Sequence, residues 1–337
     1  MIKYAILSIL SLGLFSCQST EYSQSKKLAV IDSTAIENVV VAYEKYDLGG
    51  NTSVDNDQKY SYRWSGEPKE NSTKFGYFIN DSTEIPYMRR RRDLGQTFTY
   101  DQEEKKVLSG LIIRTGYGSN VVRSEVYGAA VSVQFFEVTG DAVINDNGSS
   151  GDIKAFHGFP SDRHTREIPA IRDDYITGET YKSLKVFSGY NFPAKREFGF
   201  ENDTITISPA NPQVKGRLLH FTFPKEQSII LEPGKRYGFL IMLDKSKKGH
   251  GFTLANNFIG SYEGGHGIRR EGNGVFPPPP AHPDKPFDAP ENIKALKASK
   301  LPENWEERLA ISPGTDGYPD VDTWRDLNFY IEAVSIK

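Results

Sequence analysis

Histidine, arginine and tyrosine gather in three stretches of the sequence. The stretch "SYEGGHGIRREGNGVF" (261–276) supplies Tyr262, His266, Arg269 and Arg270. The stretch "FHGFPSDRHTRE" (156–167) supplies His157, Arg163 and His164, and "YMRRRRDLG" (87–95) supplies four consecutive arginines, Arg89 to Arg92, expected between strands. Each stretch alone is typical of a solvated loop. Three of them in a chain with a formal charge of only -3 favour a shared ligand.

These residue types suit recognition of a charged sugar, because arginine forms paired hydrogen bonds with carboxylate or sulfate and aromatic rings pack on sugar faces. A uronic acid invites β-elimination, in which the C5 proton is removed and the group on C4 departs. The loop at 261–276 predicts His266 as base and Tyr262 as acid, with His157 and His164 as alternative catalytic residues. The carboxylate would be bound by arginines drawn from Arg269, Arg270, Arg89, Arg92 and Arg163.

Other kinds of site have weaker support in the sequence. There is no HExxH motif, no cysteine pair, no G-x-S-x-G and no spacing that singles out two carboxylates. The elimination needs no cofactor. The segment "NDNGSSGD" (145–152) is most simply a hydrophilic turn, with structural calcium as the minority alternative. Without a basic excess, at a pI near 6.1, nucleic acid is not an expected partner.

The first residues have the layout of an export signal. "MIKYAILSILSLGLFSC" places a lysine and an apolar run before the single cysteine, Cys17. This arrangement resembles a lipoprotein signal, although Phe15 is larger than the residue common at its position, and an ordinary secretion signal is the alternative. The resemblance implies lipidation of Cys17 and a membrane-anchored protein of the cell envelope, on the periplasmic or the surface face of the outer membrane.

Strand signals dominate the remainder of the chain. Short β-branched and aromatic runs alternate with Gly, Pro, Asn and Asp clusters, which predicts an all-β fold, an antiparallel β-sandwich. We expect a signal at 1–17, a flexible tether at 18–35 and one domain at 36–337, with insertions near 145–181 and 275–322. "DTITISP" (203–209) is among the predicted strands, and 289–310 is the one good helix candidate, inside the proline-rich second insertion.

The succession "RDLGQTFTY", "LSGLIIRTG", "VSVQFFEV", "LEPGKRYGFLIML", "GSYEGGHG" and "DTWRDLNFYIEAV" resembles the jelly-roll domains of secreted carbohydrate-active and carbohydrate-binding proteins from polysaccharide-degrading bacteria. The resemblance spans roughly 92–334 and consists mostly of strands and turns. It implies a jelly-roll lipoprotein of a polysaccharide-utilisation system, similar to ulvan-type lyase, dehydratase or glycan-binding components of marine bacteria. The expected partner is an acidic oligo- or polysaccharide.

Three functions follow as alternatives. The first is an eliminating enzyme, a lyase if the leaving group is a sugar and a dehydratase if it is hydroxide. The second is a non-catalytic surface glycan-binding module, in which exposed aromatics such as Trp64, Tyr117 or Tyr190 form the platform. The third is a structural or adhesion domain, which has no need of clustered histidines.

Overall fold

The structure is a computed structural model that describes residues 28–48, 52–63, 73–74, 77–78, 85–140, 142–143, 176–177, 179–247, 249–257, 262–271, 320–322 and 326–336. Within these ranges the chain folds into two antiparallel sheets packed as a sandwich, as predicted. None of the described helices has the length and apolar character needed to cross a membrane.

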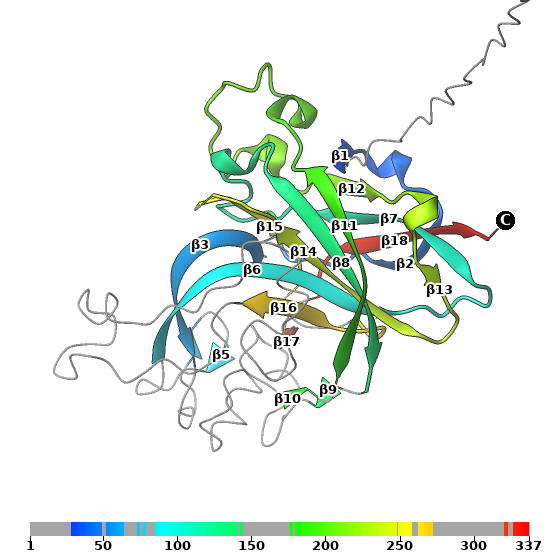
Figure 1. Ribbon diagram of the computed structural model, residues 1–337. Helices are drawn as coiled ribbons and strands as arrows, with labels where there is room; N and C mark the ends of the chain where they lie inside the picture. The colour runs from blue at the N-terminus through cyan, green and yellow to red at the C-terminus, as the bar shows by residue number, and fades with distance from the viewer. Residues whose placement is uncertain are drawn as a thin grey trace, which may run out of the picture.

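The larger sheet of the described chain has eight strands. They are β3 (Thr52–Arg63), β6 (Ile85–Thr99), β8 (Ala130–Thr139), β11 (Thr180–Asn191), β14 (Arg236–Leu243), β15 (Gly251–Leu254), β16 (Gly267–Glu271) and β17 (Asp320–Asp322). The central order is β11-β8-β14-β6-β16-β17, with β3 paired to both β6 and β15. In Figure 1 the long strands β3 and β6 curve away together at the left.

The smaller sheet of the described chain has six strands. They are β1 (Leu28–Ile31), β2 (Val39–Tyr43), β7 (Lys106–Arg114), β12 (Leu218–Thr222), β13 (Ile230–Leu231) and β18 (Phe329–Ser335). Their order is β1-β12-β7-β18-β2, with β13 also paired to β7, so β2 lies at an edge. Two short pairs lie apart from both sheets, β4 (Thr73–Lys74) with β5 (Tyr77–Phe78) and β9 (Ala142–Val143) with β10 (Ile176–Thr177).

The described helices are single 3-10 turns in connections: η1 (Ser33–Ala35), η2 (Ser124–Val126), η3 (Lys195–Phe198), η4 (Pro212–Val214) and η5 (Lys225–Gln227). The helix candidate at 289–310 lies outside the described residues.

The larger sheet is buried on both faces. Strand β8 shows why: Val133 and Phe135 enter the main core between the sheets, whereas Phe136 and Val138 enter a separate apolar cluster with Tyr181 on the opposite face. Alternate side chains of a strand point to opposite faces, so a strand covered on both sides is apolar at nearly every position. Polar groups on the second face therefore lie among buried apolar side chains. Burying such a group costs free energy unless it has a hydrogen-bond or ion-pair partner.

Three sequence predictions are corrected by the fold. Residues 28–31 of the expected tether form β1, which pairs with β12, so the folded chain begins before residue 36. Arg89 to Arg92 lie inside β6 rather than between strands. Arg89, Arg90 and Arg92 pair with β3, with a register shift between Arg90 and Arg92. Residues 203–209 form bends instead of a strand. There Asn202 Oδ1 accepts hydrogen bonds from the backbone N–H groups of Thr204 and Ile205, and this local turn competes with sheet pairing.

Candidate active site

His266 is placed on the second face of the larger sheet. Its backbone N–H donates to Thr97 Oγ1 at 2.9 Å, and its carbonyl accepts from the Thr97 N–H at 2.8 Å. The preceding Gly265 permits this approach, because a Cβ atom there would collide with the Thr97 carbonyl. Two residues further on, Ile268 joins the apolar cluster of the second face. His266 and Ile268 therefore share that face, and the sequence-predicted loop is a turn leading into strand β16.

Glu179 is the centre of a polar cluster on this face. Its side chain has no exposed surface, and Tyr181 Oη donates to its Oε2 at 2.6 Å. Arg236 forms an ion pair with Oε1 from β14. His266 Nε2 lies 2.8 Å from Oε2, an ion-pair contact rather than an aligned hydrogen bond. Three strands thus bring a tyrosine, an arginine and a histidine to one buried carboxylate.

Both ring nitrogens of His266 face acceptor oxygens. Nε2 faces the Glu179 carboxylate, and Nδ1 lies 3.0 Å from the carbonyl oxygen of Gly267. Neither neighbour can donate a hydrogen bond, so the arrangement suits the doubly protonated ring. Nδ1 has to leave the Gly267 carbonyl before it can exchange a proton with a ligand. The side chain keeps 16% of its surface exposed, which gives a ligand access.

A small cavity opens beside Arg236. It encloses about 290 Å³ and is lined by Lys235 and Arg236 together with the end of β8 from Glu137 to Gly140. Arg236 Nη1 donates to the Gly140 carbonyl at 2.6 Å, which fixes the guanidinium at the rim. Contacts with Glu232 and then Glu137 raise the pKa of Lys235, so its ammonium stays charged. The cavity thus presents the Arg236 guanidinium and the Lys235 ammonium next to the Glu179 cluster, together with the Glu137 carboxylate, which pairs with Lys235 at 3.2 Å.

Arg270 was predicted to bind substrate, but its side chain is buried within the protein. Its side chain is 1% exposed, and Nε donates to Asp93 Oδ2 at 2.8 Å while Nη1 donates to Gln134 Oε1 at 3.0 Å. These two hydrogen bonds join β16 to β6 and β8. Arg270 is therefore a structural residue and does not bind substrate. Arg269 alternates to the opposite face of the sheet and is half-buried, so it does not join the cluster around Glu179.

Tyr262 is separated from His266 by the sheet. Its ring packs against Tyr43 at a centroid distance of 5.1 Å and edge-on against Phe329 at 5.6 Å, both of which belong to the main core. Tyr262 therefore does not reach His266, and Tyr181 is the tyrosine of the cluster. The predicted pairing of His266 with Tyr262 is corrected accordingly.

Some of the other residues predicted for the site lie within the described part of the structure, and others lie outside it. Arg89 has only its backbone in the described structure, and Arg92 is half-buried in β6. His157, His164, Arg163, Cys17 and Trp64 lie outside the described residues, so their roles stay predictions. Of the proposed aromatic platform, Tyr190 is fully buried and donates to the Thr222 carbonyl, which excludes it. Tyr117 stacks on Tyr46 at 4.7 Å.

Sequence reasoning missed Glu179, Tyr181 and Arg236. Glu179 and Tyr181 are two residues apart, so they share a face of the chain as it enters β11, a spacing that was available as a signal. Arg236 follows the Pro233-Gly234 turn, where a charged residue usually means a solvated strand end. What the sequence did not show was that these strands converge.

The described part of the chain contains no group of three or more His, Cys, Asp or Glu side chains placed to hold a metal ion. Comparison with protein-family models, with curated proteins and with solved structures gives no match for this chain.

Proposed function

We propose that the protein acts on uronate-containing oligosaccharides by β-elimination at the Glu179 cluster, as a polysaccharide lyase or an oligosaccharide dehydratase. The observation that carries the proposal is the convergence of His266, Arg236 and Tyr181 on one buried carboxylate, beside a cavity lined by Arg236, Lys235 and Glu137. Arg236 and Lys235 supply positive charge for a sugar carboxylate, and the partly exposed His266 ring supplies a group for proton transfer.

Arg236 and Lys235 are the proposed carboxylate-binding groups. Arg236 keeps 26% of its side chain exposed although one edge is paired with Glu179, so its outer N–H groups face the cavity. Binding a uronate carboxylate there neutralises it, which makes the adjacent C5 proton easier to remove. The reacting carbons then lie on the side of His266.

His266 is the proposed acid–base group, acting through Nδ1. The ring enters the reaction neutral, after Nδ1 has lost its proton and turned away from the Gly267 carbonyl. It takes the C5 proton as electrons form the C4=C5 bond and the C4–O bond breaks. The imidazolium then gives the proton to the departing oxygen. Glu179 stabilises this cation, and Tyr181 holds Glu179 in place through its 2.6 Å hydrogen bond.

The second candidate function is that of a non-catalytic glycan-binding module, and the contacts of the His266 imidazole support it. Because both nitrogens of His266 face acceptors, the resting cluster is cationic at its exposed edge and binds a carboxylate without any proton transfer. In that case the arginine, lysine and imidazolium act together as an anion site.

Incubation of the full chain with saturated oligosaccharides of glucuronate, galacturonate and mannuronate separates these functions. Ultraviolet absorbance of the unsaturated uronate product reports elimination, and calorimetry on the same samples reports binding. Elimination supports the enzyme. Binding without new absorbance supports the module, and the absence of both overturns the proposed site.

The variant that locates the reaction is His266→Asn. General acid–base catalysis contributes about 100- to 10,000-fold, so we expect kcat to fall within that range. The thermal unfolding temperature should fall only modestly, because Arg236 still pairs with Glu179. Tyr127→Phe is the matched control, since Tyr127 packs against Phe192 and Phe198, away from the Glu179 cluster.

A further inference from the structure

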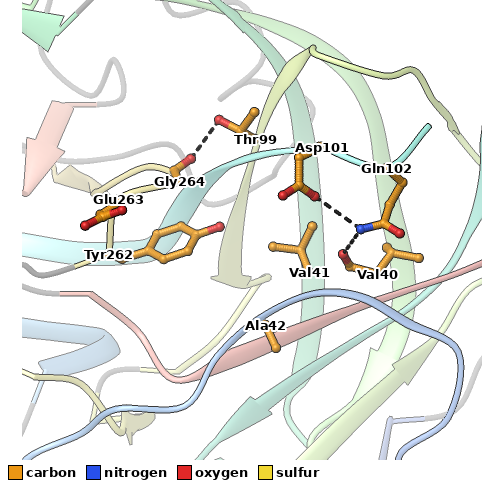
Figure 2. Close-up of a pocket in the computed structure, with 9 residues that line it drawn as sticks. All are labelled: Val40, Val41, Ala42, Thr99, Asp101, Gln102, Tyr262, Glu263 and Gly264. Atoms are coloured by element: carbon orange, nitrogen blue, oxygen red, sulfur yellow. Dashed lines mark hydrogen bonds between the residues drawn. The ribbon is translucent and has the colours of Figure 1, made fainter. Parts of the chain in front are cut away.

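A second cavity lies at the end of the sandwich, at the open edge of β2. It encloses about 520 Å³ between Val40, Val41 and Ala42 on one side and the turn at Tyr262 on the other, with Asp101 and Gln102 above (Figure 2). Its volume lies in the range of small-ligand sites. Because Tyr262 and His266 occupy opposite faces of the sheet, this cavity is distinct from the Glu179 cluster.

The Tyr262 hydroxyl is the polar group that this cavity leaves open. In Figure 2 it points toward Asp101 across the cavity. Burial of the ring, and then the charges of Asp101 and Asp326, raise the pKa of Tyr262 above its ordinary value, so the phenol stays neutral and able to donate. The ring is fixed by the main core, and the Tyr262 N–H donates to Asp326 Oδ2 at 2.8 Å. The hydroxyl is thus held in position for a ligand.

The opposite wall supplies acceptors and an apolar floor. Gln102 Nε2 donates to the Val40 carbonyl and to Asp101 Oδ1, both at 3.2 Å, which orients the Asp101 carboxylate and leaves its second oxygen to the cavity. The side chains of Val41 and Ala42 are aliphatic. A phenol, a carboxylate and an aliphatic surface together match the hydroxyl groups and the C–H face of a sugar ring.

The charge of the lining selects among ligands. Among the described residues that line this cavity, Asp101 and Glu263 carry carboxylates and none has a basic side chain, so a uronate or sulfate group is repelled there. A calcium ion requires six to eight oxygen ligands, far more than these two carboxylates supply. We propose that the cavity between β2 and the Tyr262 turn is a subsite for an uncharged sugar residue.

Ligand-observed NMR with the full chain tests this, using methyl β-D-xyloside and methyl β-D-glucoside as neutral probes. Sodium glucuronate, methylammonium and calcium chloride serve as charged probes. We expect saturation transfer to at least one neutral probe. In Tyr262→Phe the affinity for that probe should fall by about 2- to 10-fold, the range expected for the loss of one neutral hydrogen bond. The Tyr127→Phe control should bind as the parent does.

The outcomes separate this subsite from the proposed function. Neutral-sugar binding that persists in His266→Asn but weakens in Tyr262→Phe supports a second site, whether or not elimination occurs. Failure of both neutral probes to bind overturns the proposal, as does binding that Tyr262→Phe leaves unchanged. Methylammonium or calcium that displaces the neutral probe and binds more tightly would instead make the cavity a cation site.

Discussion

At the scale of single residues, Glu179 decides the character of the site. A carboxylate with no exposed surface is costly to bury unless it is paired and hydrogen-bonded. Here Tyr181 satisfies it by hydrogen bonding, while Arg236 and His266 balance its charge. The two cations remain accessible on their outer sides, so the buried charge orients groups that meet the ligand.

Replacing Glu179 by Gln removes that charge with little change in volume. We expect a stability loss of about 2 kcal/mol, because Arg236 and His266 then face an uncharged amide inside the protein. We also expect a fall in kcat, since the imidazolium loses its stabilising partner. Chemical denaturation and the uronate absorbance assay measure the two effects.

Tyr181→Phe is the matched variant for Glu179→Gln, since it deletes one hydroxyl and leaves the ion pairs intact. A stability loss of about 1 kcal/mol is expected, the value of one hydrogen bond. If Glu179→Gln proved as stable and as active as the parent, the carboxylate would have no organising role.

Arg270 and Asp93 provide a second test at this scale. The pair is nearly fully buried, so Arg270→Met removes the guanidinium that balances the Asp93 charge and should cost about 3–5 kcal/mol. Adding Asp93→Asn removes that charge as well, so the double variant should be more stable than Arg270→Met alone. Urea unfolding of the parent, the two single variants and the double variant measures this, and a double variant as unstable as the sum of both changes would argue against a coupled pair.

At the scale of elements, strand β6 positions the site. It pairs with β14 on one side and with β16 on the other, the two strands that carry Arg236 and introduce His266. Close packing at this junction depends on Gly95, whose missing side chain leaves room for the Phe239 carbonyl of β14. An error in this pairing would displace both cations of the site.

Gly95→Ala tests the junction. The added methyl group would collide with the backbone of β14, so we expect a loss of at least about 3 kcal/mol, or no folded protein. Gly238→Ala is the control in the neighbouring strand, where a Cβ atom would have nearest neighbours at 3.4 Å, and it should fold with a nearly unchanged unfolding temperature. Equal tolerance of both substitutions would contradict the packing described for β6.

The elements also show how far sequence patterns reach. The segment "VSVQFFEV" was correctly expected to be a strand, β8, because a strand buried on both faces is apolar along most of its length. The four arginines misled because a charge run predicts a solvated segment, whereas residues from β3, distant in sequence, pair with them in a strand. In the same way, residues 267–271 of the predicted loop form strand β16, because they pair with β6, which is distant in sequence.

The candidate site was predictable only in part. His266 was identified from its glycine-rich surroundings, but its partners Glu179 and Arg236 come from strands whose proximity is a property of the sheet order. Arg270 was predicted to bind the ligand because residue type and sequence spacing do not show whether a side chain is buried. Pairwise convergence of distant residues is the information that a single sequence lacks.

At the scale of the whole molecule, His250 links stability to pH. Its side chain is largely buried, and burial followed by the charge of Lys247 lowers its pKa below the ordinary value of 6.5. The unfolded chain therefore binds this proton more readily than the folded chain. The contribution to stability is present above pH 6.5 and is lost as pH falls through the folded-state pKa.

His250→Asn should flatten this dependence. We expect the parent to lose more of its unfolding temperature between pH 7.5 and pH 5.5 than the variant does, because the variant has no ring to protonate. Thermal unfolding at the two pH values gives the comparison. A variant with the same or a steeper pH dependence would exclude His250 as a source of acid sensitivity.

The most direct test of the proposed function compares elimination by the parent, His266→Asn and Tyr127→Phe on one set of uronate oligosaccharides, with absorbance of the unsaturated product as the measurement. The Glu179 cluster predicts that His266→Asn lowers kcat by about 100-fold or more and that Tyr127→Phe leaves kcat unchanged. Full activity in His266→Asn, or an equal loss of activity in Tyr127→Phe, would contradict the assignment of the chemistry to this face of the sheet.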